Sequence, residues 1–227
     1  MGSYYTYLPQ TYTDAAGVVH PVVDTYGQPV LSSETLDTGK DMNHKWTGGV
    51  NTSISAFGLT LSAQLDVRYG GTMFSRTKNL MQFTGNAYVT EYNERRPFII
   101  PNSVVKVGDE YVANTTPILM SDQGLQDYWN KYGAGQGGEY YLVDRTFAKL
   151  RNLSLTWELP KKWVNAAKLS NVAITLFGNN LFTWTARDNY DIDPESTTTG
   201  TDLAGGFGEL YSNPSCRVFG VNLSIKY

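Results

Sequence analysis

The side chains that most often carry chemistry are few in this sequence and stand apart from one another. His20 and His44 lie in polar stretches, and neither has a second ligand at a spacing that metal sites use. Cys216 is the single cysteine, so neither an intrachain disulfide nor a cysteine-based metal cluster can form. No nucleophile elbow is present, and Gly70-Gly71 lacks the Lys-Ser/Thr of a phosphate-binding loop. We therefore predict no enzymatic activity, no metal and no cofactor.

Two other groups of side chains are candidates for ligand contact. The acidic stretch Asp188–Glu195 resembles a calcium-binding loop, but the glycine and the final glutamate of such a loop are missing from the required places. Tyr128, Trp129 and Tyr132 lie in a long polar segment. Their rings either stack on the sugar rings of a substrate or pack the segment against itself, and the sequence leaves both readings open.

The composition narrows the class of protein. The net charge is −3 and no basic patch is present, which argues against nucleic acid as a partner. No run of eighteen apolar residues occurs, which excludes a membrane-spanning helix. Aromatic residues make up 13% of the chain and charged residues only 17%. This balance is typical of a β protein in which polar and apolar side chains alternate.

The sequence predicts strands because apolar and polar residues alternate with a period of two. The last stretch, Arg217–Tyr227, alternates up to its final residue. Trp46–Phe57 and Leu59–Tyr69 alternate on either side of a very short turn and predict a β-hairpin. Leu153–Leu159 and Val172–Leu176 alternate in the same way. We therefore predict five strands, near residues 45–57, 58–70, 140–159, 170–185 and 215–227.

Each predicted strand has one apolar and one polar face. The apolar positions are Leu59, Leu61, Leu65, Val67, Leu153, Leu155, Trp157, Leu159, Val172, Ile174 and Leu176, and in the last strand Phe219, Val221, Leu223, Ile225 and Tyr227. The polar positions include Gln64, Asp66, Arg68, Asn152 and Glu158. Arg151 shares the parity of Leu153, so an unbroken strand would place its charge on the apolar face. The Gly178-Asn179-Asn180 stretch interrupts the period and predicts a β-bulge.

Short and long connections alternate between the predicted strands. Short turns at residue 57 and at 160–169 alternate with long loops at about 71–138 and 186–214. A soluble β-sandwich has no reason to alternate in this way, whereas outer-membrane barrels have short periplasmic turns and long extracellular loops.

The remaining segments predict little regular structure. Residues 1–42 predict an irregular, loop-like lead-in with one short hairpin at most. Within the first long loop we expect a helical turn or two at Ser75–Phe83 and a small hairpin at Val104–Val112. A short helix at Asp122–Tyr132, capped by Asp122, is also predicted.

Several stretches, taken together, resemble the C-terminal strands of SusC/RagA-type TonB-dependent outer-membrane transporters of Bacteroidetes. They are Lys45–Thr52, Leu61–Gly71, Lys149–Trp163, Phe177–Trp184, Asp193-Pro194-Glu195 and Phe219–Tyr227. They cover most of residues 43–227 in the family's order. The last residue of this sequence is Tyr227, whereas Phe is the commoner last residue in the family. Both residues are aromatic.

The resemblance implies a fold, a location and partners. The family has a 22-strand barrel in the bacterial outer membrane, an N-terminal plug, a segment that contacts TonB, and a SusD-like surface lipoprotein that hands over oligosaccharides or peptides. This all-β sequence would supply about five antiparallel transmembrane strands, with short helices in its long extracellular loops, and is expected to be a C-terminal fragment.

The resemblance also assigns roles to the two faces. The apolar positions would face lipid, and the polar positions would line the lumen. The apolar residues of the last strand resemble the signal for barrel insertion. Arg151 is expected near the outer interface or displaced by a bulge, because an arginine at the bilayer midplane costs about 2–4 kcal/mol. Asp193-Pro194-Glu195 would be a structural turn of an extracellular loop, and Trp157, Trp163 and Trp184 would lie at the membrane interfaces.

An alternative from another class remains. In a soluble β-sandwich that binds carbohydrate or mediates adhesion, the same apolar faces would pack together into a core. The two hypotheses differ in where Leu61, Leu65, Leu155, Leu223 and Ile225 point.

Overall fold

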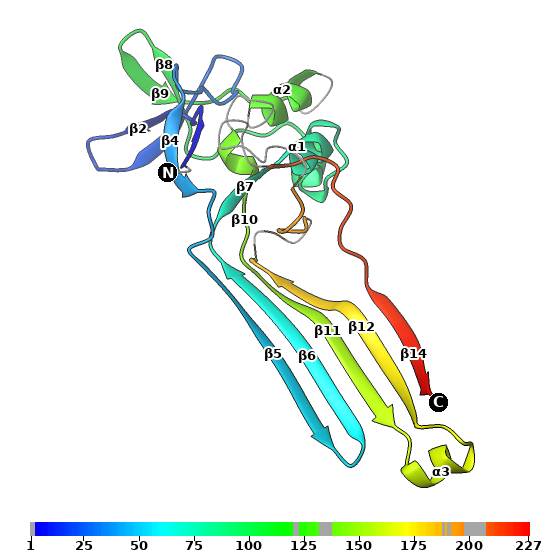
Figure 1. Cartoon of the computed structure of the whole chain (residues 1–227). Coiled ribbons are helices and arrows are strands. Elements are labelled where there is room, and N and C mark those ends of the chain that lie inside the picture. Colours follow the sequence, from blue (N-terminus) through cyan, green and yellow to red (C-terminus); the bar gives the residue numbers. More distant parts are fainter. Residues whose placement is uncertain (1–2, 120–122, 132–137, 188, 190–191, 198–207) are drawn as a thin grey trace. The chain divides into compact units, whose positions relative to one another are not determined.

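The structure, a computed structural model, describes residues 3–119, 123–131, 138–187, 189, 192–197 and 208–227 (Figure 1). This part of the chain is mostly β-sheet with a few short helices. The chain divides into two compact units, and each is described by itself. Unit 1 consists of Met1–Met42, Thr72–Val143 and Thr197–Ser212, and unit 2 consists of Asn43–Gly71, Asp144–Ser196 and Asn213–Tyr227.

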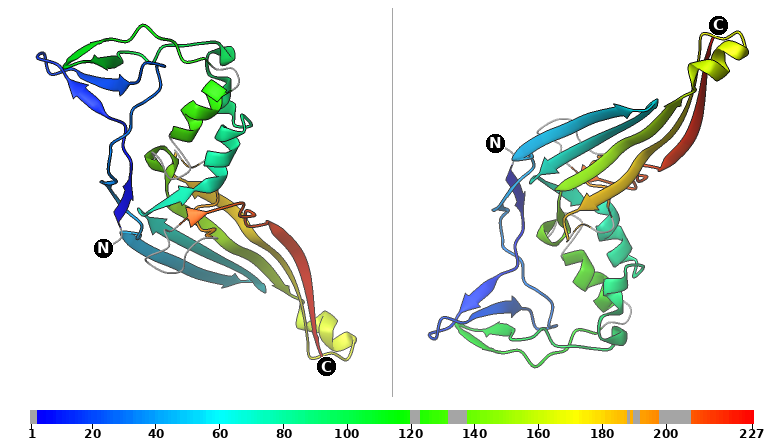
Figure 2. Two further views of the ribbon diagram at one scale, coloured as in Figure 1. Left: turned by 90° about the horizontal axis from the view of Figure 1, so that it is seen from above. Right: turned by 90° about the horizontal axis from the view of Figure 1, so that it is seen from below.

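Unit 2 contains one antiparallel sheet of five strands in the order β14-β12-β11-β6-β5. The strands are β5 (Trp46–Ala56), β6 (Leu59–Tyr69), β11 (Phe147–Glu158), β12 (Asn171–Thr185) and β14 (Val218–Lys226). They run side by side in every view (Figures 1 and 2). All five lie where the period-two alternation predicts a strand, so these strand predictions are confirmed.

The short connections of unit 2 lie at one end of the sheet. Phe57 and Gly58 form the two-residue turn between β5 and β6, with φ angles of 53° and 79°, as tight hairpin turns require. Helix α3 (Lys161–Ala166) joins β11 to β12, and its Val164 is buried. The C-terminus lies at this end too (Figure 1). At the other end the strands are joined through the long segments that the sequence places there.

The pairing of β11 with each of its two neighbouring strands is irregular at Arg151, and this irregularity decides which face of the sheet the Arg151 side chain lies on. On β11, Leu150 pairs with Leu65 of β6 and Asn152 pairs with the next residue, Gln64, so that Arg151 is an extra residue. On the other side of β11, the register with β12 shifts at the same place, opposite Asn180, whose φ is 52°. The predicted bulge at 178–180 is therefore confirmed. Because of the bulge in β11, Leu150 and Leu153 share the apolar face and Arg151 lies beside the polar one.

Unit 1 is built from small sheets of short strands. A two-stranded sheet pairs β1 (Ser3–Thr6) with β4 (Leu36–Asp41). A three-stranded sheet has the order β10 (Leu142–Asp144), β7 (Thr72–Ser75) and β13 (Gly208–Glu209). A four-stranded sheet has the order β2 (Thr11–Thr13), β3 (Val19–Val23), β8 (Val104–Val107) and β9 (Glu110–Ala113). The predicted hairpin at 104–112 is the β8–β9 pair. The segment 1–42, expected to be irregular with one hairpin, contains four short strands. Strands of three to six residues show little alternation, and β3 is stabilised by parallel pairing with the distant β8.

The helices of unit 1 are short. They are α1 (Arg76–Phe83), α2 (Gln123–Lys131), and 3-10 turns in Tyr88–Arg95 and Gly138–Tyr141. Helices α1 and α2 lie where the sequence predicts them; the proposed cap at Asp122 falls outside the described residues. The α1 N-terminus is fixed by Glu209, whose buried carboxylate accepts hydrogen bonds from the hydroxyls of Ser75 and, at 2.7 Å, Thr77. A carboxylate is favourable at this position because of the helix dipole.

Candidate functional site

The first candidate site is the sheet of unit 2, because its two faces differ in chemistry. The strand registers place aliphatic residues opposite one another. Leu61 is opposite Leu155, Leu155 is opposite Leu176, and Leu176 is opposite Val221. The apolar face is therefore continuous across neighbouring strands. These side chains are not covered: Leu176 is 53% exposed and Val221 is 69% exposed.

The other face of the sheet carries hydroxyl and amide side chains that pair across the strands. Ser55 and Thr60 are 2.8 Å apart, Thr156 and Thr175 are 2.8 Å apart, and the Asn152 amide nitrogen donates to the Asn179 side-chain oxygen at 2.8 Å. Cross-strand pairs of this kind stabilise a sheet by about 0.2–1 kcal/mol each. This face is mostly polar, although Phe147, Phe177 and Val218 also lie on it, so the sheet has the two-sided character that the sequence predicts.

Every polar position that the sequence assigns to the lumen lies on this polar face. By register, Gln64 is opposite Asn152, Asp66 is opposite Lys149, and Arg68 is opposite Phe147. Glu158 is opposite Ala173 and follows the same alternation from Thr156. The positions assigned to lipid lie on the other face. That one face meets lipid and the other a lumen stays a prediction.

A cluster of six charged side chains lies on the polar face beside the bulge. The members are Asp66, Arg68, Lys149, Arg151, Asp193 and Glu195, which we call the charged cluster. Lys149 is its centre: the side chain is fully buried, and its Nζ donates to Asp193 Oδ1 at 2.7 Å and to Glu195 Oε2 at 3.0 Å. Three positive and three negative charges balance, which offsets the cost of burying Lys149 and Asp193.

Arg151 joins two strands and a loop. Its Nη1 donates to Glu195 Oε2 at 2.7 Å, and its Nη2 donates to Asp66 Oδ2 at 2.7 Å and to Glu195 Oε1. Two parallel bonds from one guanidinium to one carboxylate form the strongest ion-pair geometry. The expectation that a bulge displaces Arg151 is therefore confirmed.

The loop carboxylates of the charged cluster titrate at low pH. Hydrogen bonds from Arg151, aided by Lys149 and opposed by burial, lower the pKa of Glu195 to about 2. Burial pushes the pKa of Asp193 upward, but hydrogen bonds from Lys149 and Ser215 outweigh it and the pKa is lowered. Both groups are therefore ionised at neutral pH.

The sites suggested by histidines and acidic residues differ from metal sites. Asp193 and Glu195 form a turn in which the Glu195 N–H donates to Asp193 Oδ1 at 3.1 Å, and the oxygens that calcium would need are bound by Lys149 and Arg151. His44 Nδ1 lies 2.7 Å from the Gly70 carbonyl oxygen. Among the described residues, no group of three His, Cys, Asp or Glu side chains is arranged to hold a metal.

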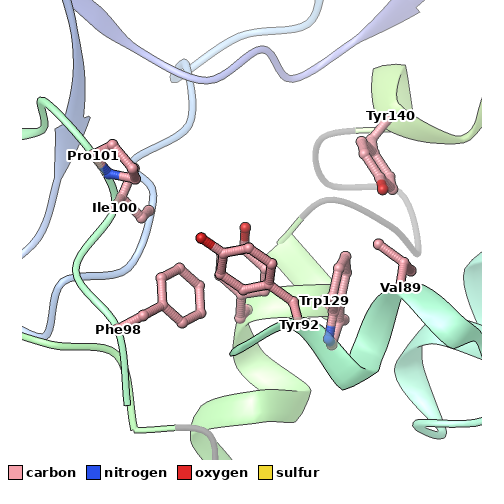
Figure 3. A pocket seen from close by; sticks show the side chains of 8 residues that line it. Val89, Tyr92, Phe98, Ile100, Pro101, Trp129 and Tyr140 are labelled. Carbon is pink, nitrogen blue, oxygen red and sulfur yellow. The ribbon is translucent and has the colours of Figure 1, made fainter. Parts of the chain in front are cut away.

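A second candidate site lies in unit 1, where the predicted loop aromatics gather. Trp129 is buried, and Tyr128 packs against it edge to face at 4.9 Å between ring centroids. Tyr128 also contacts Phe98 at 5.7 Å, and Phe98 contacts Tyr92 at 5.0 Å. These rings line a pocket of about 300 Å³ (Figure 3). The packing of these rings against one another fits the second reading, and their contact with a sugar stays a prediction. Tyr132 falls outside the described residues.

Sequence reasoning missed Lys149 and the pocket residues Tyr92, Phe98 and Tyr140. A signal for the charged cluster existed: Lys149 and Arg151 are two residues apart, as are Asp193 and Glu195. Two opposite charges at the same spacing in each segment favour ion pairing between the segments. No comparable signal marks Tyr92 or Phe98.

None of the helices in the described part of the chain has both the length and the apolar character needed to span a membrane.

Comparison with known proteins identifies the fold. No protein-family model matches the sequence, and no curated protein matches it. Three solved structures that share the fold are the RagAB peptide importer in the open-open state, the same importer in the closed-closed state, and the RagAB peptide transporter. Each has a TM-score of 0.61 and 17% identity over 99% of this chain.

This chain spans 22% or 23% of the length of the chains it matches. It therefore has the fold found in about a fifth of a RagAB importer chain, which agrees with the resemblance of its sequence motifs to SusC/RagA-type transporters.

Proposed function

We propose that the sheet of unit 2 is part of the wall of a TonB-dependent transporter barrel in the bacterial outer membrane. Its apolar face meets lipid, and its polar face lines the lumen. The observation that carries this proposal is the continuous apolar face, because its large aliphatic side chains are exposed across neighbouring strands. A patch of this kind on a protein in water marks an interaction surface.

The strand lengths support a membrane span. Strand β6 has 11 residues, which at about 3.4 Å per residue gives about 37 Å. A tilt of about 45° reduces this to about 26 Å along the membrane normal, close to the apolar band of about 25 Å in outer-membrane barrels.

The edges of the sheet support a larger barrel. Strands β5 and β14 are its edges, and each has backbone groups on one side that no described strand pairs. In lipid an unpaired backbone group costs several kcal/mol, so spanning sheets close into barrels. We infer that further strands of the transporter pair with β5 and β14. The short turns would lie at the periplasm and the long segments outside.

The soluble β-sandwich is the weaker hypothesis. A sandwich needs a second sheet about 10 Å from the first, packed on the apolar face. Among the described elements of unit 2, α3 is the sole helix and no second sheet is present. The exposure of Leu61, Leu155 and Leu223, at 45%, 40% and 59%, does not fit a sandwich core.

The substrate and partners follow from the same proposal. The transporter imports oligosaccharides or peptides, receives them from a SusD-like surface lipoprotein and is energised through TonB. The fold shared with RagAB peptide importers supports peptides as one of the two substrate classes. The charged cluster holds the 193–195 turn against the polar face, which would keep the loop beside the lumen.

The proposal is tested by fractionation of cells that carry the natural gene. The polypeptide is expected in the outer membrane, resistant to carbonate extraction and soluble only in detergent. A polypeptide of these residues that stays soluble and monomeric without detergent contradicts the proposal.

A further inference from the structure

Three lysines gather at the end of the unit 2 sheet where helix α3 joins β11 to β12 (Figure 1). The connection, residues 160–171, contains Lys161, Lys162 and Lys168 and no acidic residue. All three lysines are exposed. The Lys161 ammonium group donates to the Ser170 carbonyl oxygen at 3.4 Å, and no acidic side chain in the described part of the chain forms an ion pair with any of the three. We call these three residues the lysine patch.

Two tryptophans lie beside the lysine patch, at the end of the apolar face. Trp157 is opposite Leu59 on one neighbouring strand and Ile174 on the other, so it belongs to that face. Trp163 of α3 contacts Trp157 edge to face, with ring centroids 6.2 Å apart. Both rings are partly uncovered, with 39% of Trp157 and 58% of Trp163 exposed. Tryptophan is enriched where the hydrocarbon of a membrane meets its headgroups, so the lysine patch lies beside a pair of rings suited to that level.

Helix α3 is fixed against the sheet, which gives the lysine patch a defined position. Val164 of α3 is 2% exposed, and its carbonyl oxygen accepts a hydrogen bond from the Leu169 N–H at 3.1 Å. The next residue, Ser170, donates its N–H to the Lys226 carbonyl oxygen of β14 at 2.7 Å. Lys162 lies about 200° around the helix axis from the buried Val164, so it points away from the sheet.

Positive charge at this end of the sheet is not balanced on the apolar side. Glu158, the acidic residue nearest to the lysine patch in sequence, lies on the polar face opposite Ala173. Lys226 alternates with the apolar residues of β14 and is opposite Asn171, so it belongs to the polar face as well. The other short turn, at residues 56–59, carries no charge. Lysine side chains at the end of an apolar surface lay their stems along it and extend their ammonium groups into the polar layer.

We propose that the lysine patch and the Trp157–Trp163 pair form a binding site for a phospholipid with an anionic headgroup. The ammonium groups bind the phosphate of the headgroup, and the two rings lie where the acyl chains begin. Two observations carry the inference, the unbalanced positive charge and its continuity with the exposed apolar face. The inference rests on the proposed barrel wall and names the lipid that the short-turn end of that wall prefers.

The test measures which lipid lies beside α3 in the full natural polypeptide. Native cysteines are replaced by Ser, and a fluorescent label is attached to an Asn165→Cys variant, at an exposed position of α3. The protein is reconstituted into vesicles of phosphatidylcholine and phosphatidylglycerol, and a nitroxide near the headgroup of one lipid or the other quenches the label. Phosphatidylglycerol is expected to associate at least about fivefold more tightly than phosphatidylcholine, which is the effect of one lysine near an anionic lipid. The preference should fall as the salt concentration rises.

Matched variants assign the preference to the lysine patch. Replacing Lys161, Lys162 and Lys168 together by Gln removes its charge and should bring the ratio of the two association constants to about one. Replacing the same three residues by Arg keeps the charge and should keep the preference. Lys226→Gln removes one charge at the same end of the sheet but on the polar face, and it should leave the ratio at the wild-type value.

Three results would overturn the inference. They are equal association of the two lipids with the wild type, a preference that survives the three Gln substitutions, and a preference that inorganic phosphate abolishes at constant ionic strength, which assigns the site to a free anion. Each refutes the headgroup site alone as long as labelled phosphatidylcholine still quenches, because α3 then contacts lipid. If neither lipid quenches the label, the proposed barrel wall is refuted as well.

Discussion

A pair of arginine substitutions in β14 separates a lipid-facing position from a lumen-facing one. Val221 and Asn222 are neighbours in this strand and point to opposite faces of the sheet. Both are exposed, so neither substitution meets a packed core. If the strand is tilted by about 45°, each residue advances about 2.4 Å along the membrane normal. If Tyr227 lies at the edge of the apolar band, Val221, six residues before it, lies about 14 Å deep and Asn222 about 12 Å deep, both near the middle of a band of about 25 Å.

The two substitutions should therefore differ strongly. Val221→Arg places a charge at the midplane on the lipid face, which costs about 2–4 kcal/mol. That corresponds to a loss of roughly 30-fold to 700-fold in the folding equilibrium constant. Asn222→Arg places the same charge in the wet lumen and should stay within about 0.5 kcal/mol, as exposed substitutions usually do.

The assay is urea-dependent folding of the transporter into phospholipid vesicles, followed by tryptophan fluorescence. Folding into pure lipid avoids effects on cellular insertion, which matter because both positions lie in the last strand. Equal free energies of unfolding for the two variants would refute the assignment of faces, and a larger loss for Asn222→Arg would reverse it.

Three further predictions concern the charged cluster and the hairpin turn. Lys149→Met leaves Asp193 without its buried cation and should lower the free energy of unfolding by about 3–5 kcal/mol, measured by urea denaturation, whereas the exposed Lys162→Met should change it little. The carboxylate of Glu195 has a folded pKa of about 2, below its unfolded value, so its stabilising effect is complete above about pH 4.5 and is lost as the pH falls toward 2. The difference in unfolding free energy between the wild type and Glu195→Gln should follow that course, and a difference that disappears already at pH 5 would contradict it. Gly58→Ala should destabilise the β5–β6 hairpin by about 1–2 kcal/mol, because its φ is 79° and an added Cβ lies 3.2 Å from the Glu158 carbonyl oxygen; unchanged hydrogen exchange of the Ala56 and Leu59 amides, which pair across the hairpin, would contradict this.

The long strands could be predicted from sequence because each carries its own signal. In β6, five alternations of apolar and polar residues leave one register in which all aliphatic side chains share a face. A sheet that is apolar on one side and polar on the other shows this alternation in its sequence, even where no other element of the protein packs on its apolar face. The same reasoning placed Gln64, Asp66 and Asn152 together on one face.

The rest of the structure depends on contacts between distant segments. Strict parity would put Arg151 on the apolar face, and only the bulge, held by a loop residue 44 positions away, reverses it. The pocket in unit 1 brings together Tyr92, Phe98, Trp129 and Tyr140 from four short segments. Short segments with turns and kinks have no periodicity that fixes their mutual position, so Tyr128 and Trp129 could be named from the sequence but the other walls of the pocket could not.

The most direct test of the central claim is site-directed spin labelling along β11 in outer-membrane vesicles. Cys216, the single cysteine of these residues, and any other native cysteine are replaced by Ser, and labels are placed one at a time from Leu153 to Glu158 in the natural polypeptide. The account predicts a two-residue period: labels at 153, 155 and 157 are relaxed by oxygen dissolved in lipid, and labels at 154, 156 and 158 by a water-soluble nickel complex. Labels at 153, 155 and 157 that are reached by neither reagent, or by the nickel complex alone, would contradict it.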